Sequence, residues 1–310
     1  MRAVTQSAFG GPSVLQLAEV DRPVPDHGQV LIKVEAAGVN PVDGAVRSGV
    51  YPLLGTPPFS LGWDVAGVIE ATGPGVSAFA PGDEVLGLLA FPGAGNAYAD
   101  YVLASPNEII HRPAGLTAQE AGGLPLAGLT AWQALVGIAR VGEGRRVLVH
   151  AAAGGVGHLA VQIAKAHGAH VVGTARAAKH AFLRGLGADT LIDYATEDFA
   201  TATEPVDVVF DLVGGEYGER SAAALKPGGL LVGALGGNLG ITPERAAERG
   251  VRLTVVNVRP SAADLTRLAA LVESGRLRVH VDQVLPLAEV AKAHELLSAR
   301  RTTGKIVLVP

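Results

Sequence analysis

The sequence predicts an α/β protein built from two parts, and three observations lead to this prediction. Residues 1 to about 115 are dense in Gly and Pro and carry short Val-rich runs, which are typical of closely spaced antiparallel strands. After Gly144, apolar strand-like runs alternate with helical patterns, which is typical of a parallel sheet covered on both faces. The length of 310 residues is sufficient for two domains with separate cores.

In the first part, three runs are expected to form strands: 29–39, 64–73 and 83–89. Gly- and Pro-rich segments separate them, and such segments form turns because Gly and Pro fit turn backbones. Several short strands at this spacing favour a barrel-like antiparallel unit.

In the second part, residues 116–141 have helical spacing, with Thr117 as the expected N-cap and Glu120 three residues later, as in a capping box. Beyond this helix, strands and helices are expected to alternate. Expected strands are 145–150, 170–175, 190–193, 207–213, 230–235, 279–286 and 305–310, and expected helices are 155–168, 179–187, 217–229, 262–275 and 288–300. Gly168 and Gly187 are placed to end two of the helices.

The composition excludes several classes of protein. Apolar residues make up 48% of the chain, charged residues 17%, and the net charge is −4, so a disordered chain or a basic nucleic-acid footprint is not expected. The chain contains no cysteine, which rules out disulfides and zinc–thiolate sites. The first residues lack a signal-peptide pattern, and charged residues, Gly and Pro interrupt every apolar run. We expect a cytoplasmic protein.

A glycine-rich loop, "HAAAGGVG" (150–157), connects an expected strand to an expected helix, as a dinucleotide-binding fingerprint requires. The unpaired N–H groups and positive dipole end of a helix start suit a pyrophosphate. Gly154 would admit the phosphate and Gly157 would allow close helix–strand packing. Ala152 stands where the fingerprint has its first glycine, so a plain structural turn is the alternative interpretation.

The next strand indicates which dinucleotide binds. NAD-binding units place a carboxylate about 20 residues on, at the ribose 2′-hydroxyl. Thr174 is found there, followed by Arg176 and Lys179. A hydroxyl and two cations would attract a 2′-phosphate, which favours NADPH. The alternative is that both cations are solvated surface charges.

Ordered motifs along the whole chain resemble the medium-chain dehydrogenase/reductase superfamily, specifically its zinc-free quinone oxidoreductase (zeta-crystallin-like) branch. They are "AAGVNPVDGAVRSGVYP", "GWDVAGVIEATGPGV", "GDEVLG", "AYADYV", "AGLTAWQAL", "AAAGGVG", "DVVFDLVGGE", "LKPGG" and "GKIVLVP". The resemblance implies a GroES-like, β-rich substrate domain formed by residues 1–118 and 261–310. It also implies a Rossmann NADP-binding domain, with a doubly wound parallel sheet, formed by residues 119–260.

The resemblance also implies that no metal is bound. The zinc-dependent branch has Cys where this chain has Asn40, and its "GHE" reads "GWD", so that Trp63 replaces a ligand His and Asp64 the following Glu.

The residues expected to contact the cofactor come from the glycine-rich loop, from the strand after it and from the resemblance. They are Asn40, Thr130, Gly154, Gly155, Val156, Gly157, Thr174, Ala175, Arg176, Lys179, Tyr194, Val213, Gly214, Leu235, Gly236, Asn257 and Lys305.

The resemblance implies NADPH-dependent hydride transfer to a quinone or an α,β-unsaturated carbonyl, and a homodimer. Asn40 is the first candidate for a catalytic residue, as a hydrogen-bonding amide, and Tyr51 the second, as a proton donor. Their alternatives are a turn-shaping role and a place in the pocket wall, and water is an alternative proton source. Two other functions stay open: an enoyl-thioester reductase, and a non-catalytic NADPH-binding sensor or structural protein.

Overall fold

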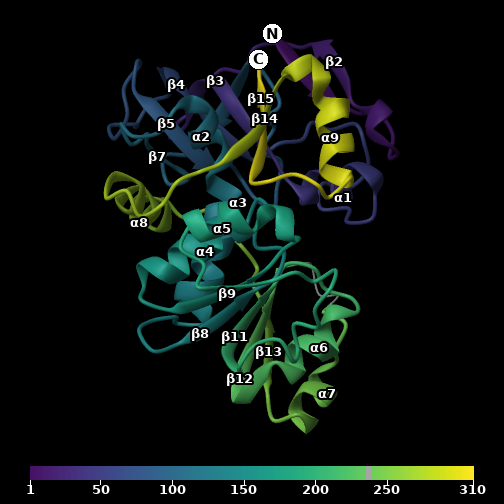
Figure 1. Cartoon of the computed structure of the whole chain (residues 1–310). Coiled ribbons are helices and arrows are strands. Elements are labelled where there is room, and N and C mark those ends of the chain that lie inside the picture. Colours follow the sequence, from purple (N-terminus) through teal and green to yellow (C-terminus); the bar gives the residue numbers. More distant parts are fainter. Residues whose placement is uncertain (235–238) are drawn as a thin grey trace. The chain divides into compact units, whose positions relative to one another are not determined.

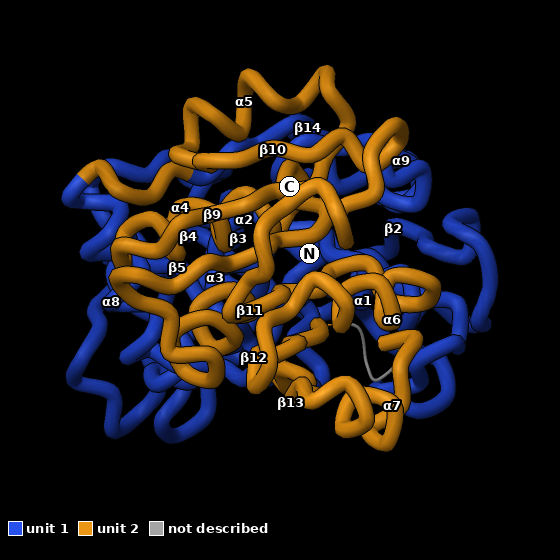
Figure 2. The backbone as a smooth tube through the Cα atoms, turned by 60° about the horizontal axis from the view of Figure 1, so that its bottom comes forward, with its two compact units in different colours: residues 1–129, 259–274, 279–310 blue, residues 130–258, 275–278 orange. Residues whose placement is uncertain are grey.

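The computed structural model describes residues 1–234 and 239–310. The chain forms two compact units (Figure 2). Unit 1 comprises Met1–Leu129, Arg259–Ser274 and Val279–Pro310, and unit 2 comprises Thr130–Val258 and Gly275–Arg278. The contacts therefore divide the chain at 129/130 and 258/259, whereas the sequence-based limits lie at 118/119 and 260/261.

Unit 1 contains a seven-stranded sheet in which β14, β15, β3, β4, β5 and β7 lie side by side and β6 pairs with β3. The pairings are antiparallel except that of β14 with β15. The bounds are β3 Val30–Val39, β4 Asp64–Thr72, β5 Glu84–Leu88, β6 Tyr101–Ala104, β7 Ile109–His111, β14 Val281–Pro286 and β15 Lys305–Val309, with a separate pair, β1 Arg2–Thr5 and β2 Gln16–Glu19. The three strands predicted in the first part are confirmed as β3, β4 and β5.

Four helices belong to unit 1: α1 Pro41–Ser48, α2 Ala118–Gly123, α8 Ala262–Glu273 and α9 Val290–Ser298. Helix α1 begins at Pro41, whose fixed φ suits the first helical position, and ends at Gly49 in the left-handed conformation (φ 81°). Helices α1 and α9 pack together (Figure 1). Short 3₁₀ turns lie at Pro12–Val14 and Leu287–Glu289.

The prediction of one continuous helix over residues 116–141 is wrong. The chain forms α2, then α3 (Pro125–Trp132), then a π-helical segment (Gln133–Ile138). The break precedes Pro125, which has no N–H to continue the ladder. The predicted cap is confirmed, because the Thr117 hydroxyl accepts from the Glu120 N–H and the Glu120 carboxylate accepts from the Thr117 N–H. Helix α2 packs against β3 and β4, which explains why it belongs to unit 1.

Unit 2 is built on a six-stranded parallel sheet in the order β10–β9–β8–β11–β12–β13. The strands are β8 Arg146–Val149, β9 His170–Thr174, β10 Thr190–Ile192, β11 Val206–Asp211, β12 Leu225–Gly233 and β13 Arg252–Val255. The helices are α4 Gly157–Ala166, α5 His180–Gly185, α6 Tyr217–Ala223 and α7 Pro243–Glu248, with a 3₁₀ turn at Ala177–Lys179. Helices α4 and α6 flank the sheet from opposite sides (Figure 1). This is the predicted doubly wound order, whose direction reverses between β8 and β11.

One helix prediction in unit 2 extends too far. Residues 217–229 were expected to be helical, but α6 ends at Ala223 and "LKPGG" opens β12. Leu225 pairs with Val206 of β11, and Pro227 and Gly228 are poor helix formers. The ends predicted at Gly168 and Gly187 are confirmed, because both glycines have positive φ.

The helices of the described residues include none long and apolar enough to cross a membrane.

Candidate functional site

The glycine-rich loop lies at the carboxyl end of β8, beside the point where the strand order reverses, which is where doubly wound sheets bind their ligands. The Ala152 N–H donates to the Thr174 carbonyl at 3.0 Å, which ties the loop to β9. A Cβ on Gly157 would lie 2.3 Å from the Ala151 carbonyl oxygen, so only glycine fits this close approach. A Cβ on Gly154 would have its nearest neighbour at 3.3 Å.

Helix α4 follows this loop, and the N–H groups of Gly155, Val156 and Gly157 at its start have no hydrogen-bond partner among the described residues, whereas the His158 N–H donates to the Gly154 carbonyl at 3.0 Å. Gly154, Gly155 and Val156 are partly exposed just before it. Unpaired donors, a positive dipole end and a glycine that leaves space together fit the pyrophosphate of a dinucleotide.

Thr174 departs from its expected role. Its side chain is fully buried, and its hydroxyl lies 3.1 Å from Nδ1 of His150, whose Nε2 lies 3.0 Å from the Ser221 hydroxyl. The hydroxyl is thus used inside unit 2 rather than presented to a phosphate. Burial lowers the pKa of His150 to about 3, and the nearby Arg220 charge adds to this, so the imidazole is neutral. Ala175 is also buried, and its N–H donates to Ile192.

Arg176 follows on the surface, with its guanidinium 5.7 Å from the centre of the Tyr194 ring. Lys179 is partly exposed one turn later. Asp193 accepts hydrogen bonds from the Ala177 and Ala195 N–H groups, which with the Arg176 charge lower the pKa of its carboxyl. The segment after β9 is therefore hydrogen-bonded to the segment after β10, and one carboxylate lies near Arg176.

Val213 and Gly214 lie in the turn after β11. Both N–H groups donate to Oδ1 of Asp211, at 2.8 and 2.9 Å, and Oδ2 of this fully buried carboxylate is without a partner among the described residues. Burial raises the pKa of Asp211. Sequence reasoning missed this residue, although Asp before a Val-Gly-Gly turn is a known turn signal.

Asn40 joins β3 to α1 and is almost fully buried. Its N–H donates to Asp43 at 2.6 Å, and its side-chain Nδ2 donates to Oδ2 of Asp64 at 2.9 Å. Its Oδ1 accepts from Nζ of Lys305 at 2.5 Å. The structure therefore brings two predicted residues, Asn40 and Lys305, into direct contact, and adds Asp64, which the sequence marked only as a replacement for Glu.

The remaining predicted residues belong to separate elements. Tyr51 is 46% exposed in the turn after α1, Thr130 is buried in α3, and Asn257 is exposed after β13. Leu235 and Gly236 lie outside the described residues.

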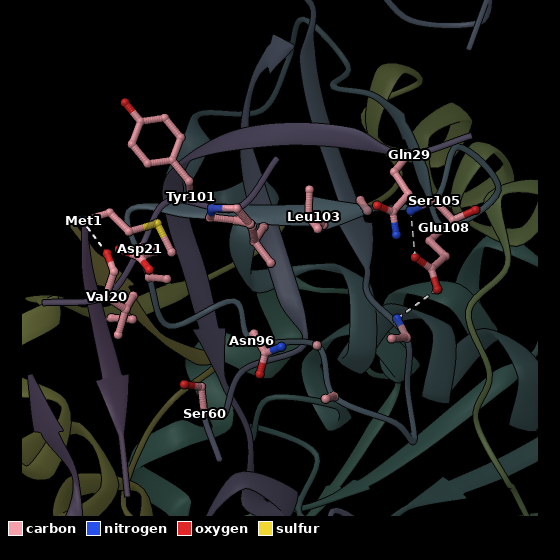
Figure 3. A pocket seen from close by; sticks show the side chains of 18 residues that line it. Met1, Val20, Asp21, Gln29, Ser60, Asn96, Tyr101, Leu103, Ser105 and Glu108 are labelled. Carbon is pink, nitrogen blue, oxygen red and sulfur yellow. Dashed lines mark hydrogen bonds between the residues drawn. The ribbon is translucent and has the colours of Figure 1, made fainter. Parts of the chain in front are cut away.

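A hollow of about 600 Å³ opens on unit 1 (Figure 3). Met1, Val20 and Tyr101 line it, with Glu108 and Asn96 from neighbouring loops. The Glu108 carboxylate is already occupied by the N–H groups of Ala90 and Ser105. No residue predicted for the site is among the residues that line this hollow, so it is separate from the predicted chemistry.

Two family models match parts of the chain. Residues 26–114 match the alcohol dehydrogenase GroES-like domain, and residues 186–308 match a zinc-binding dehydrogenase. The zinc of the second description does not fit the side chains present. Trp63 is fully buried and donates from Nε1 to the Gly93 carbonyl, and the Lys305 ammonium lies against Asn40 and Asp64. Residues 1–234 and 239–310 contain no group of three His, Cys, Asp or Glu able to hold a metal ion.

Relatives match over nearly the whole length. A quinone oxidoreductase of Pseudomonas aeruginosa is 35% identical, with 98% of each chain covered. The solved quinone oxidoreductase of Coxiella burnetii is 40% identical, with a TM-score of 0.95 and coverage of 100% of this chain and 99% of that one. The Escherichia coli quinone oxidoreductase, solved in complex with NADPH, is 31% identical with a TM-score of 0.91 over both full chains. The chain therefore belongs to the zinc-free quinone oxidoreductase branch of the medium-chain dehydrogenase/reductase superfamily.

Proposed function

We propose that this protein is a zinc-independent oxidoreductase that uses NADPH to reduce a quinone or an α,β-unsaturated carbonyl. The observation that carries the proposal is the phosphate loop between β8 and α4, with Gly154 leaving space beside the first N–H groups of the helix. The relatives named quinone oxidoreductase, and the NADPH complex of one of them, support the cofactor and the acceptor class.

The roles of the chain's own residues follow from their chemistry. The N–H groups around Gly155 and Val156 bind the pyrophosphate, and Arg176 and Lys179 attract the 2′-phosphate that distinguishes NADPH from NADH. NADPH, when bound, supplies the hydride. Its acceptor carbon is already activated by conjugation, so the protein's task is to orient the reactants and exclude water.

Proton delivery is the second task of the chain. Tyr51 is the candidate donor, since the residue is exposed, and water is the alternative donor. The zinc-independent part of the proposal is supported by the Lys305 ammonium, because a cation held against Asn40 and Asp64 repels a metal ion. The homodimer implied by the resemblance stays a prediction.

The cofactor preference is tested by removing the two cations. Arg176→Ala and Lys179→Ala should each raise the Kd for NADPH about tenfold, because each loses a charge-assisted contact worth about 1.5 kcal/mol at an exposed position. The Kd for NADH should stay unchanged, since NADH has no 2′-phosphate. Nicotinamide fluorescence measures both constants. Arg184→Ala removes an exposed cation from α5 and is the matched control. An equal loss of affinity for both cofactors would contradict the assignment.

A further inference from the structure

Lys305 is a buried lysine with three acceptors. Only 3% of the residue is exposed, and Nζ lies 2.5 Å from Oδ1 of Asn40, 3.3 Å from the Val39 carbonyl and 3.5 Å from Oδ2 of Asp64. An ammonium group has three N–H donors, so these contacts use all of them. Lys305 is therefore fully engaged inside unit 1, in contrast to the cofactor contact that the sequence suggested.

Asp64 completes the arrangement from the neighbouring strand β4. Its Oδ1 accepts from the Leu126 N–H at 2.6 Å, and its Oδ2 accepts from Asn40 Nδ2. Burial raises the pKa of this carboxyl, while Lys305, Asn40 and Leu126 act in the opposite direction. Gly38 provides the space, since a Cβ there would lie 2.5 Å from Oδ2.

The two partners decide which way the Asn40 amide faces. A lysine ammonium can only donate and a carboxylate can only accept. The amide oxygen must therefore face Lys305 and the amide nitrogen must face Asp64. The nitrogen is further directed toward the Gly38 carbonyl, at 3.4 Å. Both donor positions of the amide are thus directed at protein acceptors, and the free capacity of Asn40 is the second lone pair of Oδ1.

We propose that Lys305 and Asp64 are positioning residues that orient the Asn40 amide, so that Asn40 contacts NADPH as a hydrogen-bond acceptor. This inference rests on the proposed function. It narrows the role of Asn40, because a group of this orientation receives a hydroxyl or amide N–H of the cofactor and does not donate to a substrate carbonyl. The alternative is that the ion pair only stabilises unit 1.

Removal of one charge alone does not separate these possibilities, because Lys305→Met leaves the Asp64 charge buried and unpaired, which is strongly destabilising. The decisive variant is Lys305→Met combined with Asp64→Asn. It removes both charges, and the new amide at position 64 can hold the Leu126 N–H through its oxygen while its NH₂ group faces Asn40. The Asn40 amide then no longer lies between a group that can only donate and a group that can only accept, so its orientation is no longer fixed.

The experiment measures the melting temperature and the Kd for NADPH, the latter by nicotinamide fluorescence, in the full-length protein. We expect the double variant to regain most of the melting temperature lost in Lys305→Met. Its Kd should nevertheless stay about three- to tenfold above that of the wild type, the equivalent of one hydrogen bond. Lys33→Met, which removes an exposed lysine from β3, is the matched control and should change neither quantity.

A double-mutant cycle tests whether Lys305 and Asp64 influence NADPH affinity through Asn40. With Asn40→Ala as the background, the changes at positions 64 and 305 should cause no further loss of NADPH affinity. Recovery of both the melting temperature and the wild-type Kd in the double variant would overturn the proposal, as would fully additive losses in the Asn40→Ala background. A wild-type protein that shows no NADPH binding would instead overturn the proposed function, and this inference with it.

Discussion

Replacement of Gly154 by alanine should weaken NADPH binding about ten- to hundredfold while leaving the folded protein nearly as stable as before. The added methyl group would have its nearest neighbour, the Ala151 carbonyl oxygen, at 3.3 Å, so unit 2 needs to shift only slightly. The same methyl group occupies the space through which a pyrophosphate approaches the backbone donors. The loss of one charge-assisted hydrogen bond, about 1.5–3 kcal/mol, gives the expected change in Kd.

Substitutions at two further glycines serve as controls for this result. Gly157→Ala should lower stability as well as affinity, because its Cβ would lie 2.3 Å from the Ala151 carbonyl oxygen and 2.8 Å from Cα of Ala152. Gly185→Ala in α5 places a methyl group where no atom lies within 4 Å, and it should leave NADPH affinity unchanged. Thermal melting and nicotinamide fluorescence give the two quantities. An unchanged Kd in Gly154→Ala would contradict the assignment of the loop to a phosphate.

The free energy of unfolding should depend on pH because of buried titratable groups, and the effects of the histidines and of Asp43 have opposite signs. Burial lowers the pKa of His150 from 6.5 to about 3, and that of His294, beside Arg47, to about 3. Below pH 6.5 the two imidazoles bind protons in the unfolded chain but stay neutral in the folded chain. The free energy of unfolding therefore falls as the pH falls. Each histidine should cost about 2 kcal/mol between pH 7 and pH 5.

Asp43 opposes this loss. Burial raises the pKa of its carboxyl from 3.8 to about 7, against the hydrogen bond from the Asn40 N–H and the neighbouring Tyr98, and with Asp64 and Lys305 nearby. Between these two values the folded chain binds the proton more tightly than the unfolded chain, so Asp43 stabilises the fold as the pH falls. Its contribution over pH 7 to 5 is again about 2 kcal/mol, with the opposite sign.

Urea unfolding at pH 7 and pH 5 tests these signs. The difference in unfolding free energy between the two pH values should shrink in His150→Gln and grow in Asp43→Asn. His27→Gln changes an exposed imidazole and is the control. A pH dependence unaltered by either buried substitution would contradict the account of these groups.

The sequence predicted those elements whose signals are local. The strand, glycine loop and helix around Gly154 follow one another directly, and the Thr117–Glu120 cap spans a single turn. Such features depend on backbone geometry that a few neighbouring residues decide. The predicted helix around Pro227 was too long because Leu225 pairs with a distant strand, β11, whereas the break before Pro125 has a local cause, the missing N–H of proline.

The departures at the site have a different physical origin. The hydroxyl of Thr174 is taken by His150 from a neighbouring strand, and Lys305 meets Asn40 across 265 positions of the chain. No spacing rule reveals such contacts, since the first arises only when β8 pairs with β9 and the second only when β3 pairs with β15. The identity of Asn40 was evident from its motif, whereas the direction of its amide required the partners that surround it.

Oxidation of NADPH and NADH by the purified wild-type protein, in EDTA and with a simple quinone as acceptor, tests the central claim most directly. The account predicts faster turnover of NADPH than of NADH, at a rate that the chelator does not change. No turnover of NADPH would contradict the proposed reaction even if the cofactor bound tightly, and turnover abolished by EDTA and restored by zinc would contradict a site built from Asn40, Asp64 and Lys305 instead of a metal.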